Sequence, residues 1–138
     1  MLAVVDVNVI ISALLSRDGS PAAVLRAWQQ GRFEMLVSPL LLAELDRALA
    51  YPKLRRRIPA EDARSVVDWL GRTATLVSDP IDGPPVHSVD SGDDYLLALA
   101  ASETAPIVSG DDHLLSLKRS APVFTPAEFL DLLDRTGS

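Results

Sequence analysis

Five short aliphatic runs alternate with segments of helical character along the chain. The runs cover residues 2–5, 33–37, 75–77, 106–108 and 122–124. Short runs dominated by apolar residues are typical of strands buried on both faces. Strands that alternate with helices predict an α/β fold, with a mainly parallel five-stranded sheet covered by helices on both faces.

Pairs of Ser or Thr with Pro mark three of the predicted helix starts. In each pair, the hydroxyl residue is expected to cap the helix and the proline to occupy its first turn. The pairs are Ser20-Pro21, Ser38-Pro39 and Thr125-Pro126. Thr125 is followed by Glu128, which predicts a capping box. A fourth helix is expected over residues 60–72 from the spacing of its apolar residues.

The residues from Ser78 to Gly92 are expected to form an irregular loop, because Pro, Gly and Asp are frequent there. The loop is long for a compact domain, which indicates a functional or mobile segment. The chain has 138 residues and contains no internal repeat or convincing linker. We therefore expect residues 1–138 to form a single domain.

The composition excludes several classes of protein. The chain contains no Cys, which excludes a thiol nucleophile, a thiolate metal site and a disulfide framework. Its longest apolar run, Tyr95 to Ala101, is far shorter than the ~20 residues of a membrane span, and its start lacks the features of a secretory signal. The net charge of -6 argues against coating of nucleic acid by bulk electrostatics. We expect a soluble, cytoplasmic protein without a membrane partner.

Two aspartates follow predicted strands closely. Asp6 comes directly after the run 2–5, and Asp111 lies three residues after the run 106–108. Ligands of parallel α/β sheets bind beyond the carboxyl ends of the strands, so both side chains are expected at that edge. Asp94 opens the apolar helix that leads into the run 106–108, and the sequence does not decide which edge it faces.

A fourth carboxylate, Glu44, lies inside a predicted helix. It borders the apolar stripe that contains Leu41 and Leu45, whereas Asp46 lies on the opposite side and faces water. Glu44 is therefore a candidate for the same site. The alternative is an ion pair with Arg47, three residues further along the helix.

The three aspartates also have purely structural alternatives as helix caps. Asp94 could complete a capping box with Ser91, and Asp111 could cap the short helix that follows it. Asp6 or Asn8 could cap the helix that follows the first strand. Taken singly, each of these carboxylates is explained as well by structure as by function.

Together the four carboxylates predict a cation site. Carboxylates gathered at one edge of a sheet repel one another, and a cation removes the repulsion. Hard divalent ions such as Mg²⁺ and Mn²⁺ prefer oxygen ligands, and zinc fits poorly where His is scarce and Cys is absent. A site of this kind can activate water for in-line attack on a phosphodiester.

Four motifs of the sequence stand out: D-x-N at 6–8, AEL at 43–45 with PKLRRRIP soon after, GDDYLLALA at 92–100 and IVSGDDHLL at 107–115. Together they resemble the motifs of the PIN-domain family, and more closely those of its branch of VapC-like toxins from toxin–antitoxin systems. The resemblance covers nearly the whole chain. It implies a three-layer α/β/α sandwich with a five-stranded sheet.

The resemblance also implies a Mg²⁺- or Mn²⁺-dependent endoribonuclease. By position, the metal-binding and catalytic residues are then Asp6, Glu44, Asp94 and Asp111, supported by Asn8, Ser109 and Asp112. Many relatives carry a further acid two residues after the position of Asp111, where this chain has His113. We expect His113 to be a surface residue, and we expect His87 in the loop to be solvated.

The resemblance implies three partners: an RNA substrate, a second copy of the chain in a homodimer, and a cognate antitoxin that occupies the acidic groove. The basic run Lys53, Arg55, Arg56 and Arg57 is a candidate for contacting the RNA backbone. The alternative is a solvated surface.

Two other functions remain open from the sequence. A PIN-like module could bind RNA or protein through the same carboxylates with little or no turnover. A phosphotransfer enzyme could use Asp6 as its nucleophile, although such enzymes prefer acids where this chain has Asn8.

Overall fold

The computed structural model describes residues 1–137, and Ser138, the last residue of the expected domain, lies outside them. Five strands form one sheet with the order β3-β2-β1-β4-β5, and every neighbouring pair is parallel. The strands are β1 (Leu2–Val5), β2 (Glu34–Val37), β3 (Thr75–Leu76), β4 (Ile107–Val108) and β5 (Val123–Phe124). Each expected strand is present, with an end shortened by one residue in four of the five.

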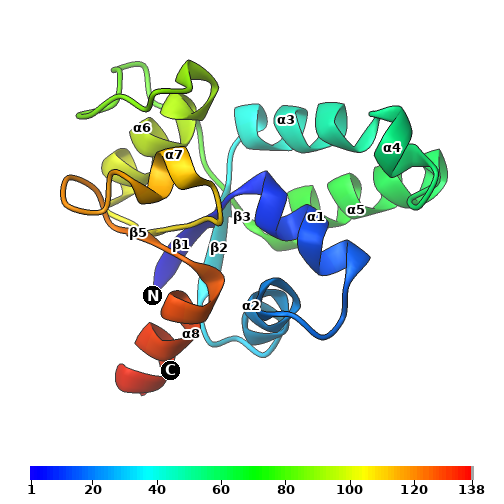
Figure 1. Cartoon of the computed structure of the whole chain (residues 1–138), viewed down its shortest axis with the longest axis horizontal. Coiled ribbons are helices and arrows are strands. Elements are labelled where there is room, and N and C mark those ends of the chain that lie inside the picture. Colours follow the sequence, from blue (N-terminus) through cyan, green and yellow to red (C-terminus); the bar gives the residue numbers. More distant parts are fainter. Residues whose placement is uncertain (138) are drawn as a thin grey trace.

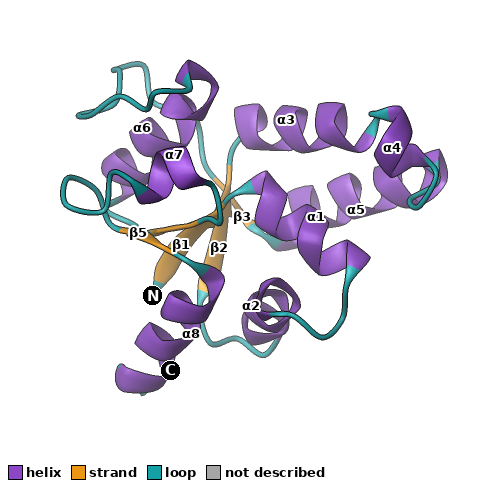
Figure 2. Cartoon of the chain, in the orientation of Figure 1, coloured by secondary structure: helices purple, strands orange, loops and turns teal. Residues whose placement is uncertain are grey.

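Helices flank this sheet on both sides (Figures 1 and 2). They are α1 (Val7–Leu15), α2 (Ser20–Gln29), α3 (Pro39–Leu49), α4 (Pro52–Arg55), α5 (Ala60–Thr73), α6 (Asp94–Glu103), α7 (Asp112–Leu115) and α8 (Pro126–Arg135), with a 3₁₀ turn η1 (Ser91–Asp93). Helix α6 packs on β1 and β4, α2 lies beside α1 and α8, and α3 pairs with α5. The expected α/β sandwich is confirmed.

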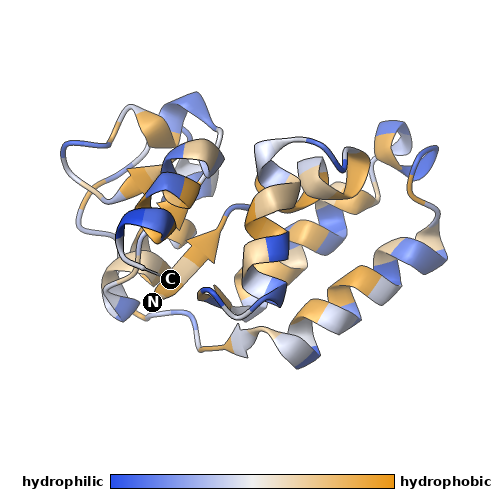
Figure 3. Ribbon diagram, turned by 90° about the horizontal axis from the view of Figure 1, so that it is seen from below, coloured by the Kyte–Doolittle hydropathy of each residue, from blue (hydrophilic) through white to orange (hydrophobic). Residues whose placement is uncertain are grey.

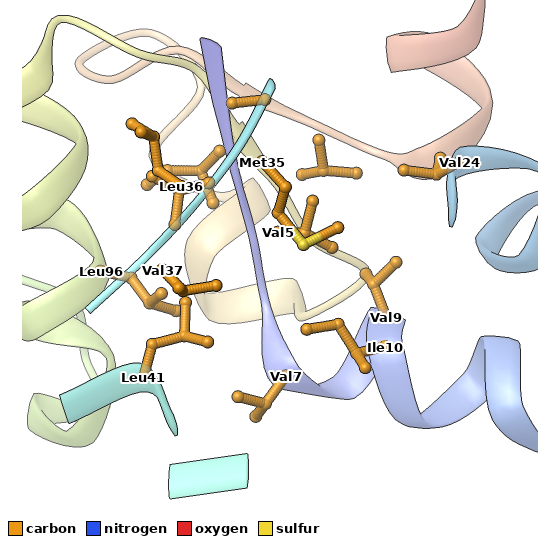
Figure 4. Close-up of a cluster of buried hydrophobic side chains, with 14 of the residues drawn as sticks. Val5, Val7, Val9, Ile10, Val24, Met35, Leu36, Val37, Leu41 and Leu96 are labelled. Atoms are coloured by element: carbon orange, nitrogen blue, oxygen red, sulfur yellow. The ribbon is translucent and has the colours of Figure 1, made fainter. Parts of the chain in front are cut away.

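The core forms where the central strands meet α1, α3 and α6. Val5 of β1 and Met35 of β2 are fully buried, as are Leu41 of α3 and Leu96 of α6 (Figure 4). Apolar residues dominate the central strands, and hydrophilic residues gather in loops and at helix ends (Figure 3). Parallel strands covered on both faces need this continuous hydrophobicity, which explains why the sequence shows runs and not alternation.

Helix caps follow the sequence at two of the three Ser/Thr-Pro pairs. Ser38 accepts a hydrogen bond from the backbone N–H of Leu41, and Thr125 forms the expected capping box with Glu128. The expectation for Ser20 is wrong. Helix α2 begins at Ser20 itself, Gly19 precedes it, and no side chain caps the first turn. Proline in the second helical position still fits, because that N–H has no partner within the helix.

The strand order places a topological switch between β1 and β4. Strands β2 and β3 follow β1 on one side of it, whereas β4 and β5 lie on its other side. In open α/β sheets, the crevice at such a switch, beyond the carboxyl ends of the strands, is where ligands bind. Residues 77–90 form the expected irregular loop, and Asp79 fixes its start by accepting the backbone N–H of Leu40 at 2.9 Å.

Candidate metal centre

Asp6 lies at the switch, directly after β1, and is 3% exposed. The register pairs Val5 with Val108, which places Asp6 beside Ser109. The fully buried Ser109 hydroxyl donates to Asp6 Oδ2 at 2.8 Å. Asp6 Oδ1 accepts the backbone N–H of Asn8 at 3.4 Å and caps α1. The capping alternative is confirmed for Asp6, and it leaves the carboxylate at the carboxyl edge of the sheet.

Asp111 is held at the same edge by the turn that follows β4. Its backbone N–H donates to the Ser109 hydroxyl at 3.0 Å, and its Oδ2 accepts the backbone N–H of Leu114 at 3.2 Å. Asp111 therefore caps α7 and lines the same cavity as Asp6. Ser109 bridges the two by donating to one and accepting from the other.

The structure corrects the expected position of Asp94. Its carboxylate turns to the loop, where Oδ2 pairs with Nδ1 of His87 and Oδ1 accepts the backbone N–H of Ser88, both at 2.8 Å. No capping box forms with Ser91, because Asp93 is the residue that precedes α6. His87 is exposed but bound to Asp94 and not simply solvated.

Asp93, one residue earlier, takes the place that was expected for Asp94. Together with Asp90 it lines a cavity of about 170 Å³ that also contains Asp6, Glu44 and Asp111. The sequence GDD offers two neighbouring aspartates, and their directions depend on the 3₁₀ turn before α6. Sequence reasoning missed Asp93 for this reason.

Glu44 reaches the cavity from α3, where it is half-buried at the border of the core, as expected. Its Oε2 forms an ion pair with the Arg47 guanidinium one turn further along. The ion-pair alternative for Glu44 is confirmed, and both members of the pair line the cavity. Asp46 is exposed, as its position on the helix predicts.

The pKa values show how crowded the carboxylates are. Burial raises the pKa of Asp6 above its ordinary value, and the hydrogen bond from Ser109 only partly opposes this. Burial, the adjoining Asp111 carboxyl group and the charges of Asp6 and Asp90 raise the pKa of Asp93 to about 7. The group thus holds a proton near neutral pH that a cation would displace.

The donor set suits a hard divalent cation. Carboxylate oxygens of Asp6, Glu44, Asp93 and Asp111 line one cavity, and oxygen ligands are those that Mg²⁺ and Mn²⁺ prefer. Asp93 Oδ2 is buried and has no hydrogen-bond partner among residues 1–137. A buried carboxylate oxygen in that state needs a proton or a cation beside it.

His113 lies beside this group. One ligand atom each of Asp90, Asp93 and His113 falls within 4.8 Å of the others. His113 is exposed in the first turn of α7, as expected for a surface histidine.

The remaining expected site residues lie at the margin of the cavity or away from it. Asn8 is exposed and lines the cavity, whereas Asp112 lies outside it. The basic run is exposed on α4 and the turn after it, at the far end of α3 from its N-terminus (Figure 1). Arg57 donates to the backbone carbonyl of Leu15.

Tyr95 is a cavity residue that the sequence did not single out. Its hydroxyl is buried and has no hydrogen-bond partner within the described part of the chain. Burial and the nearby charges of Asp6 and Asp93 raise its pKa above the ordinary value. The only sequence clue is its place next to GDD at the start of an apolar helix.

The sequence of residues 3–113 matches the family of the PIN domain. The chain therefore belongs to the PIN-domain family. No curated protein matches the sequence.

Among solved structures, the chain is similar to one from the crystal structure of VapBC2 from Rickettsia felis bound to a DNA fragment from their promoter. The two are 14% identical, with a TM-score of 0.65 over 91% of this chain and 98% of the other. At this identity the likeness supports the fold. Among residues 1–137, moreover, no helix combines the length and apolarity needed to cross a bilayer.

Proposed function

We propose that this chain is a single-domain Mg²⁺- or Mn²⁺-dependent endoribonuclease and the toxin of a toxin–antitoxin pair. The observation that carries the proposal is the convergence of Asp6, Glu44, Asp93 and Asp111 on one cavity at the switch of the sheet. Membership of the PIN-domain family supports the same class of reaction.

In this proposal Asp6, Asp93 and Asp111 hold the cation, and Glu44 completes the set from α3. The bound ion supplies Lewis acidity, which polarises the scissile phosphodiester and lowers the pKa of an attacking water. The Ser109 hydroxyl fixes the orientation of Asp6, in the way that residues behind metal ligands commonly do. Asp93 replaces Asp94 in the ligand set, and Asp94 instead fixes the loop.

The RNA and protein partners are part of the proposal. The exposed residues Lys53, Arg55, Arg56 and Arg57 hold the phosphate backbone outside the cavity. The cytoplasmic toxin forms a homodimer and binds an antitoxin whose Arg or Lys enters the carboxylate cluster in place of the cation. Of these statements, the likeness in fold to a chain of the VapBC2 structure supports the antitoxin partner.

A cleavage assay with two matched pairs of variants tests the enzyme. We expect the purified chain to cut single-stranded RNA with Mn²⁺ and to lose activity in EDTA. Asp6→Asn and Asp111→Asn should lower the rate at least ~100-fold, because each removes a charged ligand. The neighbouring Asp112→Asn and the exposed Asp46→Asn should cleave like the wild type.

Equal cleavage by the wild type and Asp6→Asn would overturn the nuclease proposal. If no variant cleaves RNA and RNA binding persists, the chain is a binding module with this fold. The toxin role has its own test, since expression of the wild type but not of Asp6→Asn should arrest growth. Growth unaffected by an active nuclease would contradict that role.

A further inference from the structure

The cavity contains two hydrogen-bond donors that the proposed metal ligands leave unexplained. Tyr95, the second residue of α6, and Arg47 of α3 line it together with Asp6, Glu44 and Asp93. Both are donors in a cavity whose other polar side chains are mostly carboxylates. Two helices from distant parts of the sequence thus bring a phenol and a guanidinium to one place.

The Tyr95 hydroxyl is in an unfavourable environment in the free protein. The oxygen is shielded from solvent and has no partner among the described residues, which is unfavourable for a polar group of this kind. Five carboxylates line the same cavity, yet none accepts its proton. An acceptor that enters the cavity from outside would remove this cost.

Arg47 is the only basic residue among the described residues that line the cavity. Its side chain is 70% exposed and paired with Glu44. Its charge also acts on the Tyr95 hydroxyl: burial and the carboxylates raise the pKa of Tyr95, and the positive charge of Arg47 opposes this rise. Arginine presents a planar set of donors that matches two oxygens of a phosphate.

A phosphodiester provides an acceptor for the Tyr95 hydroxyl, which has none, and a second acceptor for Arg47, which is paired with Glu44. The carboxylates would hold a cation, which would offset the charge of the phosphate, and Tyr95 and Arg47 in the same cavity would supply hydrogen-bond donors to a non-bridging oxygen. Donors placed where charge develops during reaction are a main source of rate acceleration in such sites. A carboxylate ligand could accept hydrogen bonds from Tyr95 and Arg47, but the neighbouring carboxylates of the cavity would repel it. A phosphodiester that binds together with a cation would avoid this repulsion.

We propose that the Tyr95 hydroxyl and the Arg47 guanidinium bind a non-bridging oxygen of the scissile phosphodiester. This inference rests on the proposed nuclease function and adds two substrate-binding residues to it. Arg47 then has two partners, Glu44 in the free protein and the phosphate in the complex.

Two conservative variants test the inference. The probe is a short fluorescein-labelled single-stranded RNA that the wild type cleaves, and the variants are Tyr95→Phe and Arg47→Gln. We expect kcat/KM to fall about 10-fold to 100-fold in each, the range for a hydrogen bond to a charged group. Tyr51→Phe and Arg64→Gln are the matched controls, since both residues are exposed and lie outside the cavity.

Replacing single oxygens of the phosphate distinguishes binding from a structural role. Rp and Sp phosphorothioates at the mapped cleavage position should each slow the wild type. For one of the two isomers the slowing should be several-fold smaller in Tyr95→Phe and Arg47→Gln, because the contact that sulfur disturbs is already absent. Binding of Mn²⁺ measured by electron paramagnetic resonance should stay as in the wild type.

Three results would overturn the inference while the nuclease proposal stands: unchanged kcat/KM in both variants, unchanged thio-effects for both isomers, or loss of Mn²⁺ binding equal to that of Asp6→Asn. If the wild type does not cleave RNA at all, the proposed function itself fails. Mn²⁺ binding in all variants separates that failure from misfolding.

Discussion

At the scale of single residues, Ser109 orients the two aspartates Asp6 and Asp111 of the candidate site. Its hydroxyl contacts both Asp6 and the backbone N–H of Asp111 without any exposure to solvent. Buried groups of this kind are costly to leave without partners. The proposed metal ligands Asp6 and Asp111 therefore depend on Ser109, which is not itself a proposed ligand.

Removing that hydroxyl should destabilise the fold. We expect Ser109→Ala to lower the free energy of unfolding in urea by about 1 to 3 kcal/mol, because a buried carboxylate oxygen and an N–H lose their partner. The control is Ser102→Ala, whose exposed hydroxyl donates only to the carbonyl of Leu99. Equal stability of the two variants would contradict the role given to Ser109.

Asp93 should make stability depend on pH in metal-free buffer. Its pKa is about 7 in the folded chain against an ordinary value of 3.8, so the folded state binds more protons than the unfolded state between these values. Stability should then fall as pH rises through this window. We expect Asp93→Asn to remove about 1 to 2 kcal/mol of that fall, less than the full shift implies because the side chain is partly exposed.

Urea unfolding of the wild type and Asp93→Asn at several pH values between 4 and 8 measures this effect. Asp94→Asn serves as the control, because hydrogen bonds from His87 and Ser88 lower the pKa of Asp94. A parallel pH dependence in wild type and Asp93→Asn would show that Asp93 ionises normally.

At the level of the elements, the neighbouring residues Asp93 and Asp94 at the start of α6 have different roles. Asp93 faces the cavity, and Asp94 binds the loop through His87 and Ser88. The 3₁₀ turn η1 precedes α6 and sets these two directions. The segment where η1 meets α6 therefore connects the proposed metal site to the loop.

Loss of the Asp94 contacts should free the loop. We expect Asp94→Ala to speed amide hydrogen exchange several-fold in residues 80–91, because two hydrogen bonds that hold the loop are lost. Exchange in β1 and α1 should not change. Mass spectrometry of peptic peptides measures both regions, and Asp112→Ala is the matched control. Loop exchange that equals the wild-type rate would contradict the anchoring role.

For the whole molecule, a cation bound at the switch should stabilise the fold. The carboxylates come from the residue after β1, from α3, from η1 and from the turn after β4, so one ion would connect several segments at this edge of the sheet. We expect saturating Mn²⁺ to raise the stability by about 2 to 3 kcal/mol at a hundredfold excess over the dissociation constant. The rise should be larger at pH 8 than at pH 6, since protons compete for Asp93.

Thermal unfolding with and without Mn²⁺ measures the rise. Asp6→Asn should show little or none of it, and Asp46→Asn should show all of it. A shift of equal size in both variants would place the ion elsewhere.

The sequence by itself determined the elements and their class. Hydrophobic runs specified the five strands because a strand buried on both faces cannot alternate, although the edge strand β3 is exposed. The caps at Ser38 and Thr125 specified two helix starts. Asp6 and Asp111 were predicted at the carboxyl edge because each follows a strand closely.

Only the tertiary structure decided which acids meet. The choice of Asp93 over Asp94 depends on a 3₁₀ turn and on hydrogen bonds from a loop whose path the local sequence does not specify. Tyr95 and Arg47 line one cavity only because the fold brings α6 and α3, which are far apart in the sequence, to the same site. Local propensity acts over a few residues, whereas the chemistry of this site depends on contacts between segments far apart in the chain.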